Sequence, residues 1–424
     1  MIEILNSLFL IISLFLIFSF PLSNKIIVER LGNYKLSFFD SYIINILFIS
    51  NCLLILSFFE LKILYICTVL YFLAIINLFY VKKKFFTNEI IIISFCIFFI
   101  LIYFFHISAY PYLEWDASVN WIFKVLNFYN DNSFENLKNL PGVIEYPHIG
   151  TYLWAMFWKI SFINEEFTGR IIYFFIYFTS IFAISNLIKT SITNRIFLII
   201  FITLISYDSI LFSGYQECLL FSLCIMFLII LDKIRKNQDT TLYIFSLILV
   251  GNLLIWTKNE GIFIICFLSI FLFYNNDLGT RKKNFIFLAF ICLIFIKKLA
   301  YLYYFDNFFL GWKGYEFITI NELFSYVSLM KLFGVGYQLI ISFFKYPIYL
   351  ISLIILILNF KKKYLIKYWL FFIIYALFTC AIFFFTNDDR WYFHTAVGLD
   401  RIMYQTSGIY IFLIVEYFKE YIEK

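Results

Sequence analysis

Charged residues are scarce in this sequence. Asp, Glu, Lys and Arg together make up 14% of its 424 residues, whereas hydrophobic residues make up 63%. Soluble domains carry about 25% charged residues, so this composition excludes a soluble globular protein. No polar stretch is long enough for a separate soluble domain, and we expect a single all-α polytopic membrane protein.

Motifs for metals and nucleotides are also missing. The eight cysteines lie almost entirely in apolar runs and form no CxxC or Cys/His pattern, which argues against zinc sites and disulfide frameworks. The absence of a GxxxxGKS motif argues against a nucleotide-driven pump. The net charge of +6 is what basic cytoplasmic loops produce and does not indicate nucleic-acid binding. The sequence therefore names no cofactor and no metal ligands, and dependence on a divalent metal stays open.

Apolar runs are what the chain has in abundance. At roughly 20 residues a span they predict about thirteen transmembrane helices, near residues 4–22, 42–59, 63–81, 88–107, 169–187, 195–212, 216–232, 241–256, 261–275, 284–303, 338–359, 366–386 and 404–418. A further apolar segment, 149–163, is short and contains Lys159, so it either crosses the bilayer or lies along its interface.

Basic residues decide between these options. They cluster near residues 25–35, 82–84, 189–195, 233–236, 281–283, 361–367 and 419–424. All these clusters fall on one side of the membrane only if 149–163 does not cross. We therefore predict an interfacial helix at 149–163, with the N-terminus outside and the C-terminus cytoplasmic, in a bacterial inner membrane. The remaining polar features then gather on the outer face, where we expect the functional site.

The first outer loop, residues 109–163, opens with two acids, Glu114 and Asp116. A carboxylate here is a candidate general base. The alternative is structural, because Asp116 precedes an apolar helical segment and acids are common helix caps. Later in the loop, His148 is either a proton carrier or a hydrogen-bonded residue of a capped turn, and the second reading is favoured.

Lys258 and Glu260 lie between two apolar runs with almost no loop. Charges at this depth are costly unless they pair or bind a ligand. The two side chains therefore either close a tight helical hairpin as an ion pair or contact a substrate. Glu217, at the outer start of the 216–232 run, is a similar case.

The last outer cluster contains Arg390, His394 and Arg401. A guanidinium group suits bidentate phosphate recognition. The alternative is a charged loop of balanced sign. Arg401, at the mouth of the final span, is the stronger functional candidate.

The order of these motifs resembles the GT-C superfamily of membrane glycosyltransferases, in the group with the aminoarabinose and protein-mannosyl transferases. The similar features are an acidic first outer loop, an interfacial helix, a proline-led segment, and polar motifs near residues 164–170, 214–217, 257–261 and 400–401. The resemblance covers roughly 103–410. It implies a GT-C-like catalytic domain at 88–424, with 1–87 as an N-terminal three-span addition.

The resemblance also implies chemistry. The donor would be a polyprenyl-phosphate-linked sugar, and the acceptor a glycan or lipid of the cell envelope, with inverting transfer at the outer face. Asp116 would be the base, with Glu114 second. Relatives pair adjacent acids, whereas Trp115 separates these two, so the choice between them stays open. Other expected site residues are Lys258, Arg390 and Arg401 for the donor phosphate, with His148, Glu217, Glu260 and His394 as further candidates.

Three rival functions remain. A polymerase or ligase of polyprenyl-linked glycans would also have about a dozen spans, but it would rely on outer-loop arginines where this loop is acidic. A flippase or transporter for lipid-linked oligosaccharides predicts charges deep within spans, whereas these charges lie at span ends. A degenerate family member acting as a scaffold is the third.

Overall fold

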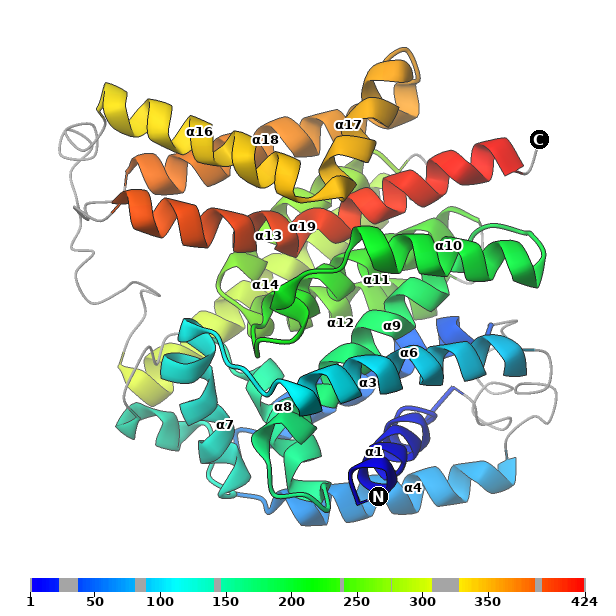
Figure 1. Ribbon diagram of the computed structural model, residues 1–424, viewed down its shortest axis with the longest axis vertical. Coiled ribbons are helices and arrows are strands. Elements are labelled where there is room, and N and C mark those ends of the chain that lie inside the picture. The colour runs from blue at the N-terminus through cyan, green and yellow to red at the C-terminus, as the bar shows by residue number, and fades with distance from the viewer. Residues whose placement is uncertain are drawn as a thin grey trace.

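The computed structural model describes residues 2–22, 37–80, 89–140, 146–236, 240–275, 277–306, 328–385 and 391–422. These residues form sixteen α-helices and no β-strand, which confirms the all-α class. Figure 1 shows α16, α17 and α18 along one side of the molecule and α1 and α4 along the opposite side, with α9, α11 and α12 between them.

Five helical segments of the described chain are long and apolar enough to cross a membrane. They are α3 (Phe38–Leu56), α6 (Ile90–Ala109), α9 (Ile171–Ser185) with the short helix before it, α14 (Thr280–Phe305), and α18 (Ile366–Phe384) with the turn before it. A sixth is added if α16 (Leu329–Lys345) and α17 (Pro347–Leu358), bent by 92° at their junction, count as one span.

The predicted count of thirteen spans is not confirmed. Five further apolar helices fall short of the same length test: α1 (Ile2–Ile17), α4 (Ile63–Tyr80), α10 (Ile192–Ile205), α12 (Thr240–Thr257) and α13 (Glu260–Phe273). Helix α1 shows one cause. Its apolar run continues to residue 22, but the helix ends at Ile17, because the chain ahead of Pro21 is driven away from helical dihedrals.

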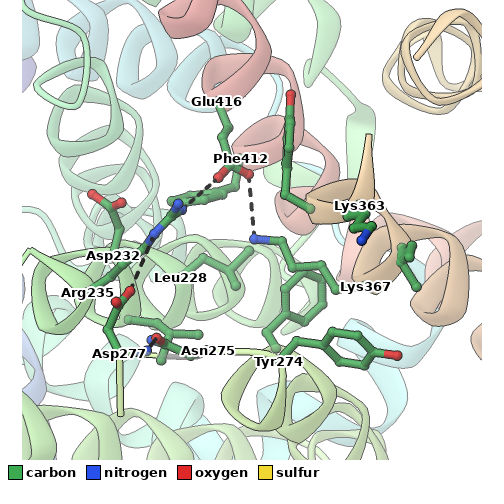
Figure 2. A pocket seen from close by; sticks show the side chains of 14 residues that line it. Leu228, Asp232, Arg235, Tyr274, Asn275, Asp277, Lys363, Lys367, Phe412 and Glu416 are labelled. Carbon is green, nitrogen blue, oxygen red and sulfur yellow. Dashed lines mark hydrogen bonds and ion pairs between the residues drawn. The ribbon is translucent and has the colours of Figure 1, made fainter. Parts of the chain in front are cut away.

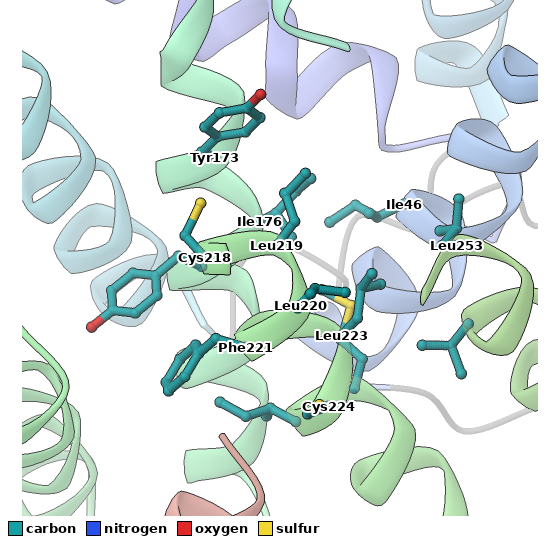
Figure 3. Packing of buried hydrophobic residues seen from close by; sticks show 14 of the residues in the cluster. Ile46, Tyr173, Ile176, Cys218, Leu219, Leu220, Phe221, Leu223, Cys224 and Leu253 are labelled. Carbon is teal, nitrogen blue, oxygen red and sulfur yellow. The ribbon is translucent and has the colours of Figure 1, made fainter. Parts of the chain in front are cut away.

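The centre of the bundle is the pairing of α11 (Glu217–Arg235) with α19 (Trp391–Ile422). Helix α11 is apolar on all sides and almost entirely buried, as expected of an interior helix. Figure 3 shows its Leu220 and Leu223 packed near Ile46 of α3 and Leu253 of α12. Gly408 allows α19 to approach closely, because a Cβ atom there would lie 2.3 Å from the backbone oxygen of Phe221.

Charged residues meet at both ends of this helix pair. Glu217 of α11 contacts Arg401 of α19 at one end, and Arg235 of α11 contacts Glu416 of α19 at the other. We call these the Glu217 end and the Glu416 end. The basic residues near 233–236 and 361–367 include several that gather at the Glu416 end, whereas the acidic first loop reaches the Glu217 end. The structure thus separates the two sets of charges. Which end faces the cytoplasm stays a prediction.

Helix α8 (Ile149–Ile160) corresponds to the segment 149–163. At 1.5 Å per residue it is about 18 Å long, too short for a hydrocarbon core of about 30 Å. Residues 149–157 are buried, and α8 packs against α7 (Ile122–Tyr129), α3 and α4. It is therefore enclosed by other helices, and its length agrees with a segment that does not cross the bilayer; its place at the membrane interface stays a prediction.

The N-terminal helices share the packing of the rest of the bundle. Helix α3 packs against α9 and α12, and α1 packs against α6 and α9. The expected boundary between residues 87 and 88 falls within 81–88, outside the described residues.

Candidate functional site

Five charged side chains of alternating sign form a continuous row at the Glu217 end. Asp116 contacts Nη1 of Arg401, and Nε of Arg401 lies 2.7 Å from Oε1 of Glu217. The same Glu217 oxygen lies 2.9 Å from Nζ of Lys258, which in turn lies 2.9 Å from Oε1 of Glu260. We call Asp116, Arg401, Glu217, Lys258 and Glu260 the charge chain. It joins the first loop, α19, the start of α11 and the turn between α12 and α13.

A left-handed glycine brings the first loop to α11. Gly214 has φ of 80°, and a Cβ atom there would lie 2.8 Å from Leu113 and 3.2 Å from Ala117. The backbone N–H of Glu114 donates to the carbonyl of Ser213 at 3.2 Å. These contacts place Asp116 beside the first turn of α11, where Glu217 is also favoured because the helix N-terminus carries partial positive charge.

Lys297 of α14 holds the α12–α13 turn that carries Lys258. Its Nζ donates to the carbonyl of Ile255 at 2.8 Å and to Oδ1 of Asn259 at 3.1 Å. Carbonyls at the end of a helix lack intrahelical partners and attract cations. Gly261 keeps the turn tight, since a Cβ atom there would lie 1.8 Å from the oxygen of Leu254. Lys297 is thus a positioning residue for Lys258.

Burial of the side chains varies along the charge chain and is greatest at its centre. The side chain of Glu217 is 0% exposed and that of Lys258 is 3% exposed, whereas the terminal carboxylates Asp116 and Glu260 are 22% and 25% exposed. Buried charges are tolerated when they are paired. Burial alone lowers the pKa of Lys258, but Glu217 and Glu260 raise it above its usual value. The accessible groups of the row are therefore carboxylates at its two ends.

Some carboxylate oxygens and N–H groups of the charge chain are not used in hydrogen bonds among the described residues. Oε2 of Glu217 and Oε2 of Glu260 are buried and have no hydrogen-bond partner among the described residues. A guanidinium offers five N–H donors, and Arg401 uses only Nε and Nη1 for its carboxylate contacts in the described chain. The row can therefore accept further donors at the carboxylates and donate from Nη2 of Arg401.

Two tyrosines line the charge chain. The guanidinium carbon of Arg401 lies 4.3 Å from the ring centre of Tyr215, a cation–π contact. Burial, followed by the nearby carboxylates, raises the pKa of Tyr215 to about 12, although Arg401 opposes the shift. Burial likewise raises the pKa of Tyr146, with contributions from Glu260 and Asp116. Both phenols remain protonated hydrogen-bond donors at neutral pH.

Other sequence candidates lie outside the charge chain. The side chain of Glu114 hydrogen-bonds Tyr112 and thereby raises the pKa of that exposed phenol. His394 lies two helical turns before Arg401 on α19, roughly 10 Å along the axis. Arg390 lies outside the described residues.

His148 is a buried core residue. Its Nε2 lies 2.6 Å from Oγ of Ser57, and its ring centre lies 4.5 Å from that of Phe134 and 5.5 Å from that of Trp256. Burial, reinforced by Lys124 and Lys297, holds its pKa well below the usual value. This environment matches the structural reading of His148, not the proton-carrier reading.

Sequence reasoning missed Tyr215 and Tyr146 as walls of the site and the anchoring role of Arg170. Arg170 is buried and donates to the carbonyls of Tyr112 and Phe212 at 2.8 and 2.6 Å. Arg170, just before α9, thereby holds the two chain segments that flank the charge chain, one at Tyr112 and the other at Phe212. The available signal was its position at the start of an apolar run, where a charge needs a partner.

Among the described residues no group of three or more His, Cys, Asp or Glu side chains is arranged to hold a metal ion. Comparisons with protein-family models, with curated proteins and with solved structures find no match for this chain. The resemblance to the GT-C superfamily therefore stands on the order of motifs in the sequence.

Proposed function

We propose that this protein is a membrane glycosyltransferase of the GT-C type, which transfers a sugar from a polyprenyl-phosphate donor to a cell-envelope acceptor, with Asp116 as the base. The observation that carries the proposal is the position of Asp116. It is an accessible carboxylate at the end of a buried row of charges, fixed by Arg401. A base that is held in place, with cations beside it, is what a displacement of a phosphate leaving group requires.

In the proposed reaction, Asp116 accepts the proton of an acceptor hydroxyl. The hydroxyl oxygen forms a bond to the anomeric carbon of the donor sugar, and the bond from that carbon to the phosphate oxygen breaks, which inverts the configuration. The electron pair leaves with the polyprenyl phosphate. Nη2 of Arg401 and the ammonium of Lys258 would stabilise the developing charge. Glu217 would keep both cations in position, since it contacts both.

Asp116 is favoured over Glu114 for the role of base. Asp116 contacts Arg401, whereas Glu114 hydrogen-bonds Tyr112 and makes no ion pair with the cations of the charge chain among the described residues. Glu260 is the other accessible carboxylate of the row, with a side chain 25% exposed, and would orient the acceptor or the sugar.

A transporter or flippase for lipid-linked oligosaccharides is the second candidate. One observation favours it: a cavity of about 610 Å³ opens at the Glu416 end, while paired charges close the Glu217 end. An alternating-access protein would have these features if the charge chain were a closed gate. The placement of two carboxylates at the accessible ends of the row is better explained by chemistry there.

The test is sugar transfer by the purified full chain from a panel of polyprenyl-phosphate sugars to membrane acceptors. Asp116→Asn should lower the turnover rate roughly 100-fold or more, as expected for loss of a general base. Glu114→Gln should lower it far less. Glu135→Gln, an exposed first-loop acid paired with Lys138 at 2.7 Å, is the matched control and should leave the rate unchanged.

Two results would count against the proposal. Full activity of Asp116→Asn would remove Asp116 as the base. Absence of transfer by the wild type, together with translocation of a fluorescent lipid-linked glycan in proteoliposomes, would replace the transferase by the transporter.

A further inference from the structure

The cavity at the Glu416 end is bounded by the ends of α11, α13, α18 and α19 and has a volume of about 610 Å³, within the usual range for small-molecule sites. Figure 2 shows that the cavity is lined by both apolar and charged side chains. Leu228, Phe271 and Phe412 provide apolar wall. Charged side chains line the rest: Asp232, Arg235, Asp277, Lys363, Lys367 and Glu416.

Asp232 is closely paired with Lys236, but the other ion pairs around this cavity are loose. Nε of Arg235 lies 3.7 Å from Asp277 and its Nη1 lies 3.4 Å from Glu416, and Nζ of Lys367 lies 3.6 Å from Glu416. Charge-assisted hydrogen bonds between such groups are usually about 2.7–2.9 Å long. Lys363 is exposed and has no carboxylate within 4 Å among the described residues. The cations here therefore retain capacity to bind an anion.

The combination of walls identifies the class of ligand. An apolar surface beside unsaturated cations suits an amphiphile that carries a negative head group. Lys363 and Lys367 are four residues apart at the start of α18 and line the same cavity. Basic pockets at the ends of membrane helices bind phosphate-bearing head groups in this way.

We propose that this cavity is a binding site for a phosphate-bearing amphiphile. Its phosphate contacts Lys363 and Lys367, and the first part of its apolar chains lies against Leu228, Phe271 and Phe412. The site is at the opposite end of the α11–α19 pair from the charge chain, so it is separate from the proposed sugar transfer and does not depend on it. Occupancy would link α18 to α11 and α19 across the cavity.

The experiment measures binding of dioleoylphosphatidylglycerol to the full chain in nonionic detergent by native mass spectrometry. Two comparators separate the parts of the ligand: dioleoylglycerol has the chains without phosphate, and glycerol 3-phosphate has phosphate without chains. The double variant Lys363→Gln/Lys367→Gln should bind the phospholipid roughly 10-fold or more weakly, since each lysine near a lipid phosphate contributes about fivefold or more in affinity.

Controls address folding and local charge. Lys361→Gln removes an exposed lysine that lies just before α18 and outside the cavity lining, and it should bind as the wild type does. Lys363→Gln alone disturbs no carboxylate contact and should weaken binding severalfold, while Lys363→Arg should retain it. An unchanged unfolding temperature without lipid shows that each variant is folded.

Three results would overturn the proposal: equal binding of dioleoylglycerol, an equal loss in Lys361→Gln, or unchanged binding in the double variant. Strong competition by glycerol 3-phosphate would also contradict the proposal, because it would show that the lysines bind a soluble phosphate ester and that the apolar chains are not needed. Lysine-dependent binding that requires both phosphate and chains would support it.

Discussion

The two ends of the α11–α19 pair contain the same kind of contact in different surroundings. At the Glu217 end, Arg401 and Glu217 lie 2.7 Å apart with side chains 15% and 0% exposed. At the Glu416 end, Arg235 and Glu416 lie 3.4 Å apart with side chains 53% and 19% exposed. One row of charges is buried and closely paired, and the other surrounds an open cavity. Since the energetic value of an ion pair depends on its solvation, the same helix pair should respond very differently to substitutions at its two ends.

The largest expected effect comes from the centre of the charge chain. Glu217→Gln removes the carboxylate shared by Arg401 and Lys258 and leaves two buried cations without it. We expect a loss of about 3–5 kcal/mol in the free energy of unfolding, as for other broken buried pairs. Denaturant unfolding in detergent measures it. Glu416→Gln is the matched substitution at the open end and should cost less, because its partner Arg235 is 53% exposed and the remaining amide oxygen can still accept from Tyr368. Similar losses at both ends would contradict the difference in solvation.

The contact between α11 and α19 is the next most sensitive point. Gly408→Ala introduces a Cβ atom that would lie 2.3 Å from the backbone oxygen of Phe221. The helices must separate, and overpacking of this kind usually costs about 1–3 kcal/mol. Because Arg401 is on the same helix, sugar transfer should fall together with the unfolding temperature. Gly336→Ala has no heavy atom within 4 Å of the new Cβ and should change neither.

The pH dependence of stability should reveal the buried His148. Its pKa is held well below the usual value by burial, so near pH 6 the unfolded chain binds a proton that the folded chain does not. Stability is therefore complete above a pH of about 6.5 and falls below it by up to about 1.4 kcal/mol per pH unit. His148→Gln should flatten this decline between pH 7 and pH 5.

The smallest effect is expected for salt at the Glu416 end. Arg235 is more than half exposed, so Arg235→Gln should cost at most about 1 kcal/mol at low ionic strength. Salt at about 0.5 M screens exposed charges strongly. It should therefore remove most of the loss in stability caused by Arg235→Gln. The effect of Glu217→Gln should persist in the same salt, because its partners are buried. A salt-sensitive Glu217 contact would show that water reaches the charge chain.

Part of the candidate site could be predicted from the sequence. Lys258, Glu260, Glu217 and Arg401 were marked because charges beside apolar runs need partners. The pairings were not visible: Lys258 was expected either to pair with Glu260 or to contact a substrate, and it contacts both Glu260 and Glu217. That second contact depends on the packing of α11 against α12, which a single sequence does not encode in any local pattern.

Other residues could not be recognised in advance. The chain contains 33 tyrosines. Tyr215 fell within the 214–217 motif, but neither Tyr215 nor Tyr146 was marked as a site residue, because the charges around them were not known. Lys297 lies within an apolar run, and nothing in its local sequence showed that it binds a backbone carbonyl at the end of α12. The ends of some helices could not be predicted either, because an apolar run shows hydrophobicity but not where a proline or a bend ends the helix.

By itself, the sequence determined an all-α protein made of apolar helices, in which the few charges within or beside apolar segments need partners, since unpaired charges there are too costly. Only the tertiary structure decided which charges meet. Arg401 and Glu217 are 184 residues apart, and Gly214 and Gly408 let the first loop and α19 approach α11 closely enough for contact. An ion pair forms only over a few ångströms, so the packing of the helices selects among many possible partners of opposite sign.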